Sequence, residues 1–203
     1  MLRVTQQPAK PTRDAVKRLA GQLRSGRVYR REDLLPFSTA VDRHLRELVD
    51  GGRLAKLAQG LYYVPRQSRF GMLPPDDEEL VAAFLRDKDF LLFSPSAYNS
   101  AGLGATQLYN RTLVYNHKRH GVFKLGNRQF DFRMKPRFPK KLSPEFLFVD
   151  ALNNLRDLAE DPAALLERAQ GRAASFDRQR LLRATDSYGS MATKKRVAAW
   201  LHA

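Results

Sequence analysis

The sequence contains no cysteine, so neither a disulfide nor a cysteine metal site can form. This composition fits the reducing cytoplasm, where we expect the protein to reside. Apolar runs are short as well, and none approaches the ~18 residues of a membrane-spanning helix. Residues 1–6 include no apolar signal region. We therefore expect neither a membrane segment nor secretion.

Acidic residues are few compared with basic ones. The chain has 36 Lys and Arg against 21 Asp and Glu, a net charge of +15, and its pI is about 10.5. Residues 1–70 hold 15 bases and 6 acids, a net charge of +9, so over half of the excess lies in the first third. A charge of this size predicts a polyanionic partner, most often nucleic acid. A basic surface that serves only solvation is the alternative.

Signatures of catalysis are also missing. There is no phosphate-binding glycine loop. His117 and His120 lie in a predicted loop beside two cations, which favours a basic binding loop or a solvated turn over a metal site. Asp131 is followed by Arg133 where a nuclease strand would have lysine, and we expect Asp131 to face solvent. No paired aspartates follow Gly189-Ser190. We predict no catalytic residue, metal or cofactor.

The first 70 residues begin with a basic arm at 1–11 and a predicted helix. Thr12 can cap this helix, and Ser25-Gly26 can end it. Its apolar stripe comes from Val16, Leu19, Ala20 and Leu23. A short strand at 27–30 and a short helix at 31–35, stopped by Pro36, are expected to follow.

A second amphipathic helix is predicted over 39–50, with Ser38 as its N-cap. Gly51-Gly52 should end it, and strands at 53–57 and 61–64 should form a hairpin around 58–60. Helix, strand, short helix, helix and hairpin are the layout of a winged helix-turn-helix domain. We assign this domain to residues 1–70.

Residues 71–203 are expected to form a second domain after a linker at 66–75. A helix should start at Asp76, followed by a strand at 90–93 and a helix at 94–103. Three strands are then predicted, at 112–116, 121–125 and 128–133, and four helices, at 144–158, 162–170, 176–184 and 190–201. The fold class is α+β: an N-terminal winged helix-turn-helix followed by a mixed α/β C-terminal domain ending in a helical segment.

DNA contacts are predicted mainly on the helix at 39–50. Its core side carries Val41, Leu45 and Leu48, so Thr39, Arg43 and Arg46 lie opposite. Arginine can bond guanine bidentately in a major groove. The remaining predicted contacts lie at the helix start, on the hairpin and before the helix: Ser38, Arg53, Lys56, Gln59, Arg30 and Arg31. Simple solvation of these side chains is the alternative.

A possible second basic surface comes from the strands of the C-terminal domain. Its predicted members are Lys118, Arg119, Lys124, Arg128 and Arg133. Either this surface binds a second polyanion, or it serves solubility.

Taken in order, these segments resemble the AbiEi-type antitoxins of bacterial type IV toxin–antitoxin systems, which act in abortive infection. The stretches that carry the resemblance are 53–65, 94–103, Thr106-Gln107, 112–133 and 188–193. The resemblance implies a DNA-binding antitoxin that represses its operon by binding inverted repeats in the promoter. It also implies a C-terminal domain that neutralises a nucleotidyltransferase-type toxin, without requiring a stable antitoxin–toxin complex.

Two other functions stay open at this point. One is a winged-helix transcription regulator whose C-terminal domain senses a ligand or dimerises. The other is an RNA-binding protein or a nucleic-acid enzyme. We expect a monomer or a weak dimer.

Overall fold

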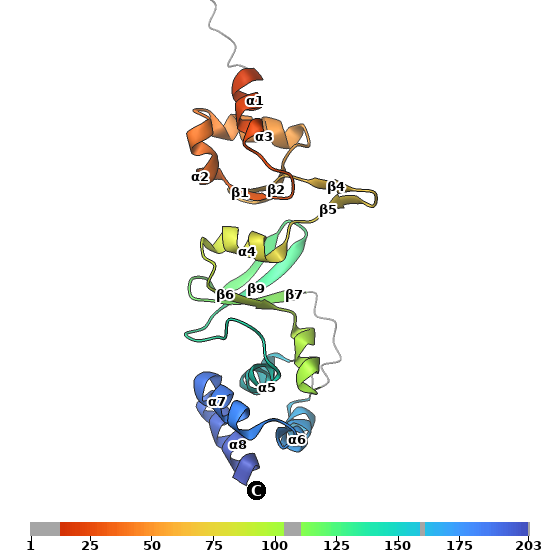
Figure 1. Ribbon diagram of the computed structural model, residues 1–203, viewed down its shortest axis with the longest axis vertical. Coiled ribbons are helices and arrows are strands. Elements are labelled where there is room, and N and C mark those ends of the chain that lie inside the picture. The colour runs from red at the N-terminus through yellow and green to blue at the C-terminus, as the bar shows by residue number, and fades with distance from the viewer. Residues whose placement is uncertain (1–12, 104–110, 159–160, 203) are drawn as a thin grey trace, which may run out of the picture. The chain divides into compact units, whose positions relative to one another are not determined.

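The computed structural model describes residues 13–103, 111–158 and 161–202 of the chain. The predicted arm at 1–11, the predicted cap Thr12 and the stretch Thr106-Gln107 lie outside the described residues. The fold is a mixed α+β fold (Figure 1). It divides into two compact units: unit 1 is Met1–Lys88 with Leu125–Asn127, and unit 2 is Asp89–Lys124 with Arg128–Ala203. The sequence placed the boundary earlier, after residue 70.

Unit 1 has a three-stranded antiparallel sheet, a separate hairpin and its helices. Its elements are α1 (Arg13–Gly21), β1 (Val28–Arg30), α2 (Arg31–Leu34), the 3₁₀ helix η1 (Leu35–Phe37), α3 (Val41–Asp50), β2 (Ala55–Ala58), β3 (Leu61–Tyr63), β4 (Arg66–Ser68), β5 (Gly71–Leu73) and α4 (Asp77–Leu85). Strand β3 lies between β1 and β2. Leu19, Leu34, Leu45 and Leu54 pack together and join α1, α2 and α3 into one core. The predicted order of elements up to β3 is confirmed.

Three boundaries in unit 1 differ from the prediction. Helix α1 ends at Gly21 rather than at Ser25-Gly26. Pro36 does not end the helical segment, because a 3₁₀ helix, η1, follows α2 directly. Pro36 lies in the first turn of η1, where no backbone N–H is needed for a hydrogen bond within the helix.

The start of α3 is the third difference. The helix begins at Val41 with Ala40 as N-cap, so Thr39 precedes it and Ser38 is not the N-cap. Instead, the Ser38 hydroxyl accepts a hydrogen bond from the Ala40 backbone N–H at 3.2 Å. It also bonds Nδ1 of the buried His44 at 2.7 Å. Ser38 therefore closes a turn ahead of the helix.

The predicted linker at 66–75 contains the antiparallel hairpin β4–β5. Each strand has only three residues, and prolines flank the pair. For these two reasons the segment resembles a linker in sequence. The next helix, α4, starts as predicted: the Asp76 carboxylate accepts a hydrogen bond from the Glu79 N–H at 2.9 Å.

Unit 2 is a four-stranded sheet with helices gathered at one side of it (Figure 1). Its elements are β6 (Phe90–Phe93), the 3₁₀ helix η2 (Pro95–Ala101), β7 (Arg111–Asn116), β8 (Gly121–Leu125), β9 (Arg128–Met134), α5 (Pro144–Asn153), the 3₁₀ helix η3 (Leu155–Asp157), α6 (Pro162–Ala173), α7 (Arg178–Tyr188) and α8 (Met191–His202). The strand order is β6-β7-β9-β8, with β6 antiparallel and β9 parallel to β7. The predicted helix at 94–103 is a 3₁₀ helix, and the predicted helix at 144–158 ends at Asn153 and is followed by η3. The remaining strands and helices lie close to their predicted positions.

Helix α5 is the centre of the unit 2 core. Every residue from Phe146 to Leu152 is buried. Phe93, Tyr98 and Tyr115 pack against it from η2 and the sheet. No helix among the described residues is long and apolar enough to cross a membrane.

Candidate functional site

Helix α3 presents two arginines to solvent. Val41, His44, Leu45 and Leu48 are buried on one face. Arg43 and Arg46 are exposed on the opposite face, as the 3.6-residue period of the helix requires. Within the described part of the chain, Arg43 makes no ion pair. The burial of one face fixes the direction of both arginines.

Three carboxylates share the exposed face of α3. Asp42, Glu47 and Asp50 are all exposed there, so the face carries both negative and positive charges. Asp42 is already occupied: its two oxygens accept hydrogen bonds from Nε and Nη2 of Arg31, each at 2.6 Å. This bond holds the pKa of Asp42 below its usual range and raises the pKa of Arg31. The pair connects α2 to α3.

The predicted DNA contacts Arg30 and Arg31 are engaged with acids, and so is the nearby Arg27. Besides the Arg31 pair, Nη2 of Arg30 lies 3.4 Å from Glu32 and Nε of Arg27 lies 3.1 Å from Glu79. Because each guanidinium carries several N–H donors, these arginines keep some capacity for a second partner. Their first role is to fix α2, β1 and α4.

The β2–β3 hairpin supplies the other cations. Arg53, Lys56 and Gln59 are exposed, and within the described residues neither Arg53 nor Lys56 makes an ion pair. No acidic residue occurs between Gly51 and Pro75. Of the two adjacent tyrosines on β3, Tyr63 is buried. This hairpin is basic without local neutralisation.

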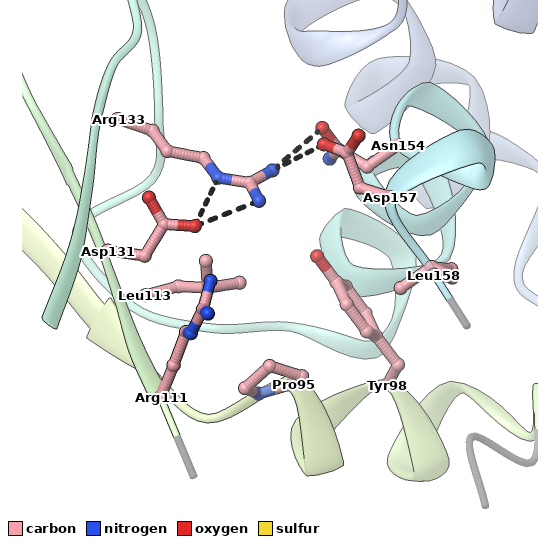
Figure 2. Close-up of a pocket in the computed structure, with 9 residues that line it drawn as sticks. All are labelled: Pro95, Tyr98, Arg111, Leu113, Asp131, Arg133, Asn154, Asp157 and Leu158. Carbon is pink, nitrogen blue, oxygen red and sulfur yellow. Dashed lines mark hydrogen bonds and ion pairs between the residues drawn. The ribbon is translucent and has the colours of Figure 1, made fainter. Parts of the chain in front are cut away.

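Unit 2 contains a small polar pocket, shown in Figure 2. The Arg133 guanidinium bridges two sides of it: Asp131 accepts at 3.0 and 3.1 Å, and Asp157 accepts at 2.9 Å. The cavity holds about 90 Å³. Since Arg111 also lines the pocket, two arginines and two carboxylates balance one another, and the pocket does not favour an anionic ligand.

Two expectations from the sequence are wrong at this pocket. Arg133 is not part of an open basic surface, because its charge is neutralised inside the pocket. Asp131 does not face solvent, since only 15% of its side chain is exposed. The second partner of Arg133, Asp157, lies 24 residues further along the chain, beyond the reach of a local pattern.

Helix α5 carries a buried carboxylate, Asp150. Tyr98 and Tyr115 both donate hydrogen bonds to Oδ2 of Asp150, each at 2.7 Å. Burial raises the pKa of Asp150 and also the pKa values of both tyrosines. The signal in the sequence is a single acid inside the apolar run 146–152. The bonds fasten α5 to η2 and β7.

The other predicted cations of unit 2 lie on strands and a turn. Lys118, Arg119 and Lys124 are exposed, and Arg128 lies 5.9 Å from the ring of Phe130. The Asn116 side chain accepts hydrogen bonds from the backbone of Lys118 and Arg119, at 2.8 and 2.7 Å, which shapes the turn.

The neighbouring histidine contacts an aromatic ring and an acid. His117 stacks on Phe138 at 4.8 Å and lies 3.4 Å from Asp89. No group of three potential metal ligands occurs in the described residues.

Comparison with known proteins gives a likeness of fold. No protein-family model matches the chain, and no curated protein matches it significantly. Among solved structures, the chain is similar to the crystal structure of the RV2827C protein from Mycobacterium tuberculosis, with a TM-score of 0.57 and 19% sequence identity. The match covers 92% of this chain and 74% of that one. The fold of most of this chain is thus similar to that of a solved protein of very different sequence.

Proposed function

We propose that unit 1 is a winged helix-turn-helix domain that binds duplex DNA. In this assignment α2, η1 and α3 form the helix-turn-helix, and the β2–β3 hairpin is the wing. The observation that carries the proposal is the exposed pair Arg43 and Arg46 on a helix whose opposite face is buried. An exposed helix with outward arginines, followed by a basic hairpin, has the shape and charge to enter a major groove.

Each part of the surface has its own role in this proposal. Arg43 and Arg46 bond base edges, while Arg53 and Lys56 contact phosphates from the wing. Gln59 lies in the turn at the tip of the wing, and Thr39 lies just before the start of α3. The acids of α3 oppose close approach of phosphates, so contact is restricted to positions where the arginines reach guanine. This arrangement favours specific over uniform binding.

The biological setting is proposed from the resemblance to AbiEi-type antitoxins. On that basis the DNA is an inverted repeat in the promoter of the chain's own operon, and unit 2 antagonises a nucleotidyltransferase-type toxin. The exposed Lys118, Arg119 and Lys124 of unit 2 are its candidate surface for that second role. Co-expression with the product of the neighbouring gene, scored by growth, tests this setting separately from DNA binding.

DNA binding itself is tested by selecting duplexes from a random library with the full chain and measuring affinity against salt. With roughly five phosphate contacts, the slope of log K against log salt should be about −4 to −5. Arg43→Ala with Arg46→Ala should weaken binding, while charge reversal at Lys118 and Arg119 should leave the affinity for the selected duplex nearly unchanged. Failure of the wild-type chain to select or bind any duplex would contradict the proposal.

A further inference from the structure

The β4–β5 hairpin is the most exposed apolar feature among the described residues of unit 1. It projects from the rest of unit 1 (Figure 1). Phe70, at its turn, is 85% exposed, and Met72 on β5 is 59% exposed. Burying such side chains against a partner is favourable because it removes apolar surface from water.

The base of the hairpin is firmly attached to unit 1. The Tyr63 hydroxyl donates a hydrogen bond to the Leu73 carbonyl at 2.9 Å. The Ser25 hydroxyl donates to the Pro65 carbonyl at 3.2 Å, and the Gly26 N–H donates to Val64 at 2.9 Å. Bonds at both ends of the hairpin fix the direction in which it leaves the sheet.

The turn of the hairpin is also specified by its residues. Gly71 has φ +107, a conformation that favours glycine. The Ser68 hydroxyl donates to the Gly71 carbonyl at 2.8 Å and accepts from the Phe70 N–H at 3.2 Å. The turn at the tip is therefore fixed by specific hydrogen bonds, and it holds the Phe70 side chain outward.

One arginine lies at the apolar tip of the hairpin and another at its base, where Arg66 pairs with Leu73. Arg66 and Arg69 are exposed, and the Arg69 guanidinium carbon lies 4.7 Å from the centre of the Phe70 ring. The hairpin contains no acid. Exposed apolar side chains on a hairpin whose arginines form no ion pair within the described residues match duplex DNA, whose grooves place phosphates next to apolar sugar and base atoms.

We infer that the β4–β5 hairpin is a second DNA-contacting element of unit 1, which rests on the proposed function. Arg66 and Arg69 lie against phosphates, and Phe70 enters the minor groove and contacts sugar and base atoms. Minor-groove proteins use arginine together with inserted apolar side chains in this way. A purely apolar protein partner would not explain the absence of acids around the tip.

The test uses the full chain and the duplex selected by the wild type, about 30 base pairs or roughly three helical turns long. Affinity and salt slope are measured for Phe70→Ala and Arg69→Gln. Met191→Ala and Arg180→Gln are matched controls, because both residues are exposed in unit 2. Thermal unfolding confirms that each variant is folded.

Phe70→Ala should lower the affinity at least about fivefold with an unchanged salt slope, since an apolar contact releases no counterions. Arg69→Gln should lower the affinity and reduce the magnitude of the slope by about 0.9. Both controls should bind like the wild type.

The contrary outcomes are distinct. Wild-type binding with unchanged Phe70 and Arg69 variants would overturn the hairpin inference alone. Absence of wild-type binding would overturn the proposed function and this inference with it. A wild-type dimer that Phe70→Ala converts to a monomer, with the affinity for DNA per protomer unchanged, would assign the hairpin to a second copy of the chain.

Discussion

Among single residues, Asp150 has the clearest consequence for stability. Its carboxyl is buried and its pKa is raised by that burial, so the folded state binds the proton more tightly than the unfolded state does. The contribution of Asp150 to the free energy of unfolding is therefore largest below the ordinary pKa, about 3.9, and is lost as pH rises through the raised pKa. Asp150→Asn removes this dependence.

We expect the stability of Asp150→Asn relative to the wild type to improve as pH rises. Asp150→Ala should lose about 2–4 kcal/mol, because the hydroxyls of Tyr98 and Tyr115 lose their acceptor. Trp200, the one tryptophan of the chain, packs against the core of unit 2 and reports its unfolding by fluorescence in urea. The same pH dependence in the wild type and in Asp150→Asn would contradict this role.

Residue positions were predictable where a helical period governs them. The inward face at Val41, Leu45 and Leu48 and the outward Arg43 and Arg46 follow from spacing alone. The burial of His44 does not follow from spacing, because a polar side chain is expected at the surface. Its bond to Ser38, which makes burial tolerable, cannot be read from the sequence. Ion pairs such as Arg133 with Asp157 depend on segments meeting in three dimensions.

At the scale of elements, the turn before α3 should stabilise the first turn of that helix. Ser38→Ala removes the acceptor for the Ala40 N–H and the partner of His44, at a cost of about 1–2 kcal/mol. Amide hydrogen exchange in α3 should accelerate roughly tenfold. Thr39→Ala is the matched control, since Thr39 is exposed, and its α3 amides should exchange at the wild-type rate. Equal exchange in both variants would reject the role of Ser38.

Elements with their own strong signals were predictable, and short ones were not. Helix α4 follows from Asp76 and the acids of its first turn, and strand β6 from four consecutive apolar residues. The β4–β5 hairpin escaped prediction, because three-residue strands show no measurable alternation and prolines precede and follow them. Its bonds to Ser25 and Tyr63 come from tertiary structure.

At the scale of the whole molecule, we expect a fragment of residues 1–88 to be more stable than one of residues 1–70. Glu79 of α4 accepts a hydrogen bond from the Val28 N–H at 2.9 Å and pairs with Arg27 at 3.1 Å. The shorter fragment loses these bonds and the bond from Tyr63 to Leu73. Thermal circular dichroism compares the two, and DNA affinity should follow the same order. A fragment 1–70 that melts no lower than 1–88 would contradict this account.

The central claim is that the exposed arginines of α3 bond specific bases. The most direct measurement is the affinity of the full chain for every single-base-pair variant of the selected duplex, with the wild type and with Arg43→Ala. We predict that Arg43→Ala removes about 1–3 kcal/mol of discrimination at one or a few neighbouring base pairs and leaves the other positions unchanged. An Arg43→Ala protein that retains the full wild-type discrimination at every position would contradict the claim.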